Sequence, residues 1–204
     1  MGQRRSEYER AFEAHLRQVG TPYVSVNEAR RALLPEGARL DLECGIDGDG
    51  EPLRSTLKNF DFVVYGPETH LLVDVKGRKI GARRARGSCA PGRLESWVTE
   101  DDVESLGVWE SVFGEGFKAA FVFLYQCEAQ PPAALFQEIF EHQGRWYAVR
   151  AVGLDAYRES MKQRSLRWRT VHVPTAAFER ISQPLCGVVE PSINEQTAPI
   201  AVNH

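Results

Sequence analysis

Residues 59–79 read NFDFVVYGPETHLLVDVKGRK and carry the strongest structural signal in this chain. Two apolar runs rich in β-branched residues flank a Gly-Pro turn, and this arrangement predicts a β-hairpin. On a strand, side chains two positions apart share a face. Asp74 and Lys76 are therefore expected to point the same way, while Val75 points to the opposite face.

The predicted hairpin carries charged side chains among apolar ones. Asp61 opens the first strand, and Asp74 and Lys76 end the second. Burying two carboxylates and an amine is costly unless they pair or bind a metal. Two carboxylates can hold Mg²⁺, which prefers oxygen ligands, and a neighbouring lysine can orient or deprotonate a water and offset charge on a phosphate. The pattern predicts phosphodiester hydrolysis, with a structural ion pair at the strand end as the alternative.

An acid at the start of one strand and an acid-x-lysine on the next resembles the PD-(D/E)XK nuclease superfamily, which includes many restriction enzymes and Holliday junction resolvases. Phe60 stands where the motif has a proline. The resemblance implies a nuclease that depends on Mg²⁺ or Mn²⁺. In it, Asp61, Asp74 and the Val75 carbonyl would hold the metal, and Lys76 would position the attacking water.

A helix is predicted over residues 6–19, because apolar side chains recur at helical spacing and Gly20 supplies a stop. Ser6 and Glu9 have the spacing of a capping box. In resolvase-like and Mrr-like nucleases, a helix of this kind contributes a glutamate to the metal site, and the resemblance places that glutamate at Glu9. The capping box is the alternative role. Residues 7–13, EYERAFE, also look like the signature of the HYExAFE proteins, with glutamate in place of histidine.

Charge is concentrated in one segment of the chain. The 204 residues have a net charge of −3 and are 43% apolar, which is ordinary for a globular protein. Residues 76–93 nevertheless contain seven basic residues and no acid, directly after the predicted catalytic strand. We expect this segment to contact phosphates, with a solubilising loop as the alternative. The expected contacts are Arg78, Lys79, Arg83, Arg84 and Arg86.

The remaining pattern completes an α/β fold. A strand near residues 23–26, the hairpin, a helix over residues 100–113 and a strand over residues 119–125 follow the first helix. This is the αβββαβ order of a restriction-endonuclease-like core with a mixed central sheet. A C-terminal extension is expected as a helix over residues 131–142, a strand over 145–152, a helix over 154–163 and a strand over 169–173. We predict a single domain over residues 1–182, with a core of about 5–127, an extension over 128–182 and a flexible tail over 183–204.

The function predicted from the sequence is a metal-dependent nuclease acting on nucleic acid, with DNA as the expected substrate. The alternative is a catalytically inactive nucleic-acid-binding or scaffold protein with the same fold. Four separated cysteines favour free thiols and a cytoplasmic location. No membrane partner is expected, and a homodimer is left open. A second basic cluster, residues 162–169 around Trp168, is a further candidate for nucleic-acid contact or a solvated face.

Overall fold

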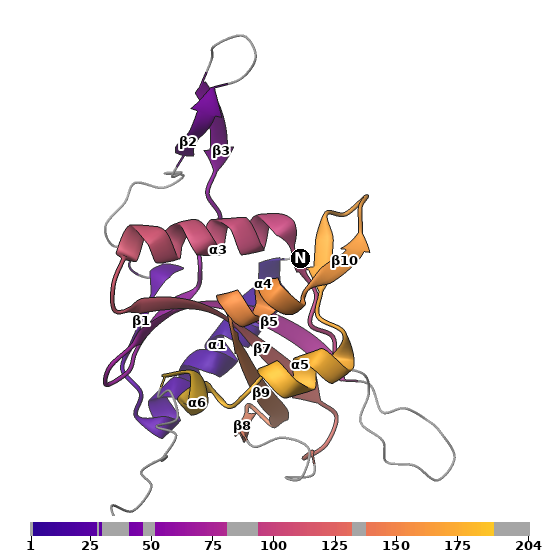
Figure 1. Ribbon diagram of the computed structural model, residues 1–204. Helices are drawn as coiled ribbons and strands as arrows, with labels where there is room; N and C mark the ends of the chain where they lie inside the picture. The colour runs from indigo at the N-terminus through magenta and orange to yellow at the C-terminus, as the bar shows by residue number, and fades with distance from the viewer. Residues whose placement is uncertain are drawn as a thin grey trace, which may run out of the picture.

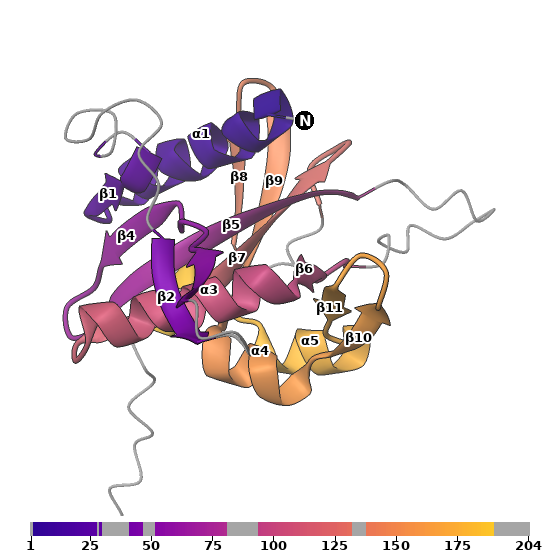
Figure 2. The same ribbon diagram turned by 90° about the horizontal axis from the view of Figure 1, so that it is seen from above.

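Helices cover both faces of the main sheet. The computed structural model describes residues 2–27, 29, 41–46, 52–80, 94–131 and 138–189. Helix α1 (Gly2–Val19) lies on one face of the sheet, and α3 (Glu100–Phe113), α4 (Leu154–Ser160) and α5 (Thr175–Ile181) lie on the other (Figures 1 and 2). Within these ranges, no helix has both the length and the apolar character needed to cross a membrane.

The main sheet is mixed, as predicted. Its strand order is β1-β4-β5-β7-β9-β8. β5 and β7 run parallel, and the other neighbouring pairs run antiparallel. The strands are β1 (Tyr23–Ser25), β4 (Phe62–Tyr65), β5 (His70–Ile80), β7 (Phe117–Cys127), β8 (Ile139–His142) and β9 (Arg145–Gly153).

The order of α1, β1, β4, β5, α3 and β7 along the chain confirms the predicted αβββαβ core, and β9 and β8 extend the sheet beyond β7. Two smaller sheets are inserted in this order. One pairs β2 (Asp41–Ile46) with β3 (Pro52–Thr56), and the other joins β10 (Lys162–Ser165), β11 (Thr170–His172) and β6 (Val98–Thr99). The fold is therefore a mixed α/β architecture built on an αβββαβ core.

The central strands are buried on both faces because helices lie above and below them. Alternate side chains of β5 enter two separate cores: Leu72 packs on the side of α3, whereas Leu71 and Val73 pack on the side of α1. Asp74 and Lys76 lie two and four residues after Leu72, so their side chains are on the same face of β5 as Leu72. The two charged residues of the motif therefore lie on the face that α3 covers.

Helix α1 begins earlier than the sequence pattern indicated. It starts at Gly2, so Ser6 lies inside the helix and the predicted capping box of Ser6 with Glu9 is wrong. The reason is that residues 3–5, Gln-Arg-Arg, are good helix formers. The predicted stop at Gly20 is confirmed, since Gly20 has a φ of 72° and ends the helix in the left-handed conformation.

Two predicted helices contain strand residues at their C-terminal ends, and residues 132–137 of the helix predicted over residues 131–142 lie outside the described residues. Residues 139–142 form β8, which pairs with β9 through a two-residue turn at Gln143 and Gly144, with φ angles of 51° and 72°. The helix predicted over residues 154–163 stops at Ser160 and gives way to β10. In both places the pairing strand, and not the local pattern, determines the conformation.

The fold also continues past the predicted end of the domain. Gln183 forms a β-bridge with Ala151 of β9. Helix α6 (Leu185–Val189) follows, and Leu185 is buried in the core on the side of α1. Residues 183–189 therefore pack against the sheet, although the sequence led us to expect a tail from residue 183.

Candidate active site

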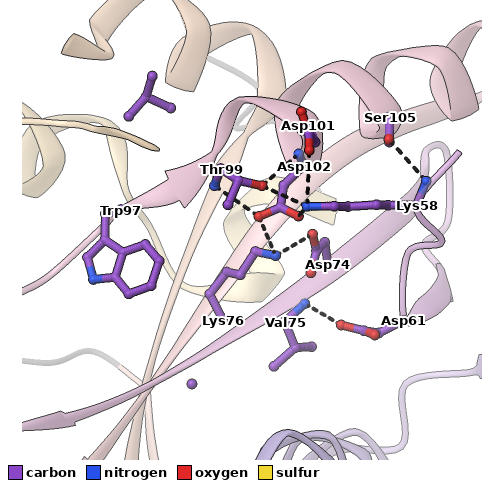
Figure 3. A network of polar contacts seen from close by, with 12 residues as sticks. Lys58, Asp61, Asp74, Val75, Lys76, Trp97, Thr99, Asp101, Asp102 and Ser105 are labelled. Atoms are coloured by element: carbon purple, nitrogen blue, oxygen red, sulfur yellow. Dashed lines mark hydrogen bonds and ion pairs between the residues drawn. The ribbon is translucent and has the colours of Figure 1, made fainter. Parts of the chain in front are cut away.

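Lys76 lies between two carboxylates. Its Nζ is 2.7 Å from Oδ2 of Asp74 and 3.1 Å from Oδ2 of Asp102 (Figure 3). The side chains of Lys76, Asp74 and Asp102 are 11%, 5% and 12% exposed. Removing one partner from such a network would leave an uncompensated buried charge. The three side chains therefore hold one another in a fixed arrangement.

Asp61 approaches the same strand from the start of β4. The chain bends at Asp61, whose backbone amide donates to the carbonyl of Val73 at 2.8 Å. Its Oδ2 accepts a hydrogen bond from the backbone amide of Val75 at 2.8 Å, so the carboxylate lies beside the peptide that joins Asp74 to Val75 (Figure 3). Asp61 and Asp74 are each 4% exposed. The structure thus brings both predicted aspartates to one point of β5.

Asp102 also closes the first turn of α3. Thr99 is the N-cap: its Oγ1 accepts from the Asp102 amide at 3.1 Å, and Oδ2 of Asp102 accepts from the Thr99 amide at 3.0 Å. This reciprocal pair is a capping box. Burial raises the pKa of Asp102, but the charge of Lys76, the Thr99 amide and Lys58 together outweigh burial and hold the pKa well below its usual value. Asp102 is therefore an anion where it faces Lys76.

Lys58 is a second cation at this carboxylate. Its Nζ lies 3.0 Å from Oδ1 of Asp102, and its side chain is 44% exposed. The backbone of Lys58 is fixed to α3, because its amide donates to Oγ of Ser105 at 3.1 Å and its carbonyl accepts from Nε1 of Trp109 at 2.8 Å. Sequence reasoning missed Lys58 and Asp102, since their roles depend on a contact between α3 and β5 that no local pattern reports.

Glu9 lies on α1, in the layer on the other side of the sheet from α3. Its Oε2 accepts a hydrogen bond from Nδ2 of Asn27 at 3.2 Å. Among the residues that the structure describes, no three Asp, Glu, His or Cys side chains are grouped so that they could hold a metal ion together. Glu9 therefore does not join Asp61 and Asp74 in a three-carboxylate cluster in this conformation.

Gly77 brings α1 close to the strand that carries the motif. A Cβ at Gly77 would lie 2.1 Å from a ring carbon of Tyr8, so the ring occupies the space that any other residue would fill. Glu9 follows Tyr8 in the chain. The helix that carries Glu9 is thus docked on β5 next to Lys76.

The predicted phosphate contacts are placed only in part. Arg83, Arg84 and Arg86 lie outside the described residues. Lys79 is exposed at the end of β5, whereas Arg78 is half-buried. The guanidinium of Arg78 lies 4.2 Å from the ring centroid of Trp97, donates to the Gly77 carbonyl at 2.8 Å and also donates to the Trp97 carbonyl. Burial lowers the pKa of Arg78. Arg78 is therefore engaged in packing next to the site.

The donor set fits a hard divalent cation. Asp61 and Asp74 supply carboxylate oxygens, and Val75 supplies a main-chain carbonyl, which are the ligand types that Mg²⁺ and Mn²⁺ prefer. Mg²⁺ is often bound through one or two carboxylates and keeps several waters, so a third carboxylate is not required. Of these groups, Asp74 contacts the Lys76 ammonium, which also contacts Asp102, so the Asp74 carboxylate is held in place beside the proposed metal position.

Comparison with known proteins adds one structural resemblance. The structure is similar to that of Hjc, a Holliday junction resolvase from Archaeoglobus fulgidus, an archaeal hyperthermophile. The match has 14% sequence identity and a TM-score of 0.48, and it covers 91% of this chain and 95% of the resolvase. No family model matches the sequence, and no curated protein matches it. A likeness of this degree carries no argument about activity, and the relation to the HYExAFE proteins stays a prediction.

Proposed function

We propose that this protein is a metal-dependent nuclease that hydrolyses phosphodiester bonds in DNA. One observation carries the proposal: Asp61, Asp74 and Lys76 meet at one point of β5, with both aspartates 4% exposed and the Lys76 ammonium 2.7 Å from Asp74. Two buried carboxylates suit a divalent cation, and an ammonium beside them suits a phosphate. The αβββαβ order of the core is also the order expected for the PD-(D/E)XK nucleases that the sequence motif resembles.

Each group has a distinct part in the proposed hydrolysis. A divalent cation at Asp61, Asp74 and the Val75 carbonyl would stabilise charge on the phosphate and make the attacking water more acidic. Lys76 would hold that water and offset negative charge as the water loses a proton to solvent and its oxygen bonds to phosphorus, the bond to the leaving oxygen breaks, and the leaving oxygen takes a proton from solvent. Asp102 would keep the Lys76 ammonium pointed at the reacting atoms.

Further residues complete the proposal. Glu9 would assist the metal from α1, and basic residues after Lys76 would hold phosphates of the substrate backbone. The proposed phosphate contacts are Arg78, Lys79, Arg83, Arg84 and Arg86. The cytoplasm as the compartment and a homodimer as the assembly stay predictions.

A nucleic-acid-binding protein without cleavage is the second candidate. One feature favours it: Lys76 is already paired with two carboxylates, Asp74 and Asp102, in a largely buried ion network. Such a network would stabilise the fold without any reaction. The two candidates differ in one measurable outcome, which is whether the purified protein breaks a phosphodiester bond.

A cleavage screen tests the proposal. Labelled single-stranded, duplex, nicked and branched DNA, with a matched RNA series, would be incubated with protein in Mg²⁺, Mn²⁺ or EDTA. We expect metal-dependent cleavage of at least one DNA by the wild type, and loss of cleavage by orders of magnitude in Asp74→Asn and Lys76→Met. Lys118→Met is the matched control, because Lys118 is 60% exposed and pairs only at the surface with Glu110.

The outcomes of the screen separate the candidates. Cleavage by the wild type and by Asp74→Asn at equal rates would refute the proposed site and indicate a contaminating nuclease. Binding of DNA with no cleavage in either metal would support the second candidate. Cleavage of RNA but not of DNA would support the proposed catalytic site and show that the substrate is RNA.

A further inference from the structure

The turn between β10 and β11 presents two large apolar side chains to solvent. Leu166 is 82% exposed and Trp168 is 68% exposed, and they are the two most exposed large hydrophobic residues in the part of the chain that the structure describes. An exposed tryptophan is common at recognition surfaces, because its broad apolar ring gains much when a partner covers it. The turn is therefore a candidate contact surface.

The exposed turn is held in one conformation. The amide of Trp168 donates to Oγ of Ser165 at 3.3 Å, and the amide of Arg169 donates to the carbonyl of Leu166 at 3.2 Å. Arg169 has a φ of 43°, so the chain closes the turn in the left-handed region. Leu166 and Trp168 are thus displayed on a structured turn, which lowers the entropy that a partner must overcome on binding.

The hairpin is joined directly to the N-terminus of α3. Thr170 of β11 pairs with Thr99 of β6, the residue that caps α3 and contacts Asp102. The side chain of Arg169 lies 3.1 Å from Glu100 and 2.9 Å from Asp101. Arg169 therefore fixes the hairpin to α3, whose N-terminal end lies beside β6 and β11 (Figure 2). Through Thr99 the hairpin shares its base with the polar network of the candidate active site.

The charge of the hairpin indicates a polyanion. Residues 162–169 contain four basic residues and no acid. The guanidinium of Arg167 lies 5.3 Å from the centroid of the Trp168 ring, so a cation stands beside the exposed aromatic face. Phosphate groups next to planar bases match this combination of positive charge and an open indole.

A row of cations and aromatic rings connects the hairpin to the strand of the motif. Arg78 follows Lys76 by two residues on β5, and its guanidinium lies 4.2 Å from the ring centroid of Trp97. Arg164 of β10 lies 5.1 Å from the same ring. Arg78, Trp97 and Arg164 thus lie in a row between β5 and the hairpin, with Glu95 3.8 Å from Arg164, and cations beside aromatic rings are expected along the path of a nucleic-acid strand.

We propose that the turn between β10 and β11 binds unpaired nucleotides of a nucleic-acid substrate. Trp168 stacks on an exposed base, and Arg164 and Arg167 contact the phosphates beside it. Paired bases inside a duplex are stacked on one another, so away from the duplex ends an indole finds a free base face only on a single-stranded segment. This inference rests on the proposed function, because it places the unpaired segment next to the bond that is cut.

A binding experiment without divalent cations tests the proposal apart from cleavage. The probes are a fluorescein-labelled blunt duplex and the same duplex with a short unpaired thymidine extension, both followed by anisotropy in EDTA. We expect wild type to prefer the extended probe and Trp168→Ala to bind it roughly 5- to 100-fold more weakly, with little change on the blunt duplex. Trp168→Phe should retain the preference, because phenylalanine can also stack.

Two further variants complete the design. Arg167→Ala should weaken binding to both probes and reduce the log–log salt slope by about 0.7 to 0.9 for the lost phosphate contact. Val112→Ala is the control, since Val112 is 62% exposed at the far end of α3 and should bind both probes as wild type does. Circular dichroism of each variant checks that the fold is retained.

Three results would overturn the proposal: equal binding of the extended probe by wild type and Trp168→Ala, no preference of wild type for the extended probe, or a dimer of wild type that Trp168→Ala converts to a monomer while DNA binding stays the same. If wild type and Trp168→Ala bind the extended probe equally and both cleave DNA in Mg²⁺, nucleotide binding by the turn is refuted and the proposed nuclease function stands. If Trp168→Ala loses the preference for the extended probe and wild type cleaves no DNA, nucleotide binding by the turn is supported and the proposed nuclease function is refuted.

Discussion

Asp102→Asn separates the charge that holds Lys76 from the cap that begins α3. The carboxylate of Asp102 lies 3.1 Å from the Lys76 ammonium and 3.0 Å from the Lys58 ammonium. It also accepts the Thr99 amide at 3.0 Å. The amide oxygen of asparagine can keep this capping bond, whereas the negative charge is lost. The substitution therefore tests the ion pairs with little effect on the helix terminus.

The magnitude follows from the exposure of each partner. Lys76 and Asp102 are 11% and 12% exposed, so their charge-assisted contact contributes about 1.5–3 kcal/mol. Lys58 is 44% exposed, and solvent limits its contribution to about 0–1 kcal/mol. Together we expect Asp102→Asn to lower the free energy of unfolding by about 1.5–4 kcal/mol at neutral pH. Urea unfolding followed by circular dichroism measures this difference.

The pH dependence has a definite sign. The folded pKa of Asp102 lies below the unfolded value of 3.8. The stabilisation is therefore fully present above that value and is lost as the pH falls through the folded pKa. The difference between wild type and Asp102→Asn should be constant near neutrality and should shrink on acidification below about pH 4. Glu104→Gln on the same helix, with a side chain 72% exposed, is the control and should change stability by less than about 0.5 kcal/mol.

Two results would refute this reasoning. Equal unfolding free energies of wild type and Asp102→Asn at neutral pH would show that the Lys76 contact contributes nothing. A difference that does not shrink on acidification would show that the effect does not come from the carboxylate charge. If the nuclease assay succeeds, Asp102→Asn should also lower kcat with little change in KM, because Asp102 acts only by holding Lys76 in place for the transition state.

Gly77→Ala should destabilise the fold by about 1–3 kcal/mol, because the added Cβ would lie 2.1 Å from a ring carbon of Tyr8; an unchanged urea midpoint would contradict this contact. Asp61→Asn should abolish the heat of Mn²⁺ binding in calorimetry but cost no more than about 1 kcal/mol of stability, because its amide oxygen can still accept the β5 amide; wild-type Mn²⁺ affinity would remove Asp61 from the site. Tyr157→Phe should cost about 1–2 kcal/mol in urea unfolding, because the buried hydroxyl donates to the Ser96 carbonyl at 2.6 Å; a change near zero would count against that bond.

The strand half of the candidate site was predictable because its signals are local. A Gly-Pro turn between two β-branched runs is enough to predict the hairpin, and the structure pairs Phe62 with Val73 on either side of that turn. Helix α3 was predictable for the same reason, since Thr99 caps it and it ends at Phe113 as expected. In each case the residues that determine the element lie inside it or next to it.

Elements that depend on distant partners were not predictable in this way. The segment IFEH of β8 is short and has a pattern that fits helix or strand, and its pairing with β9 makes it a strand. The helix predicted over residues 154–163 includes the first two residues of β10, which pairs with β11 across the turn at residues 166–169. A short polar segment has no intrinsic preference strong enough to outweigh such pairing.

The contact of Asp102 on α3 with Lys76 on β5 could be predicted only from the topology of the sheet. β5 and β7 run parallel, with His70 paired with Phe117, so the chain must return along the sheet between them. Helix α3 makes this return. Its C-terminus lies near the start of β5, and its N-terminus therefore lies over the part of β5 that carries Lys76. An acid in the first turn of this helix meets the lysine for that reason. In a chain where this order of elements is predicted, the first turn of the crossover helix is the place to look for the carboxylate that holds the lysine.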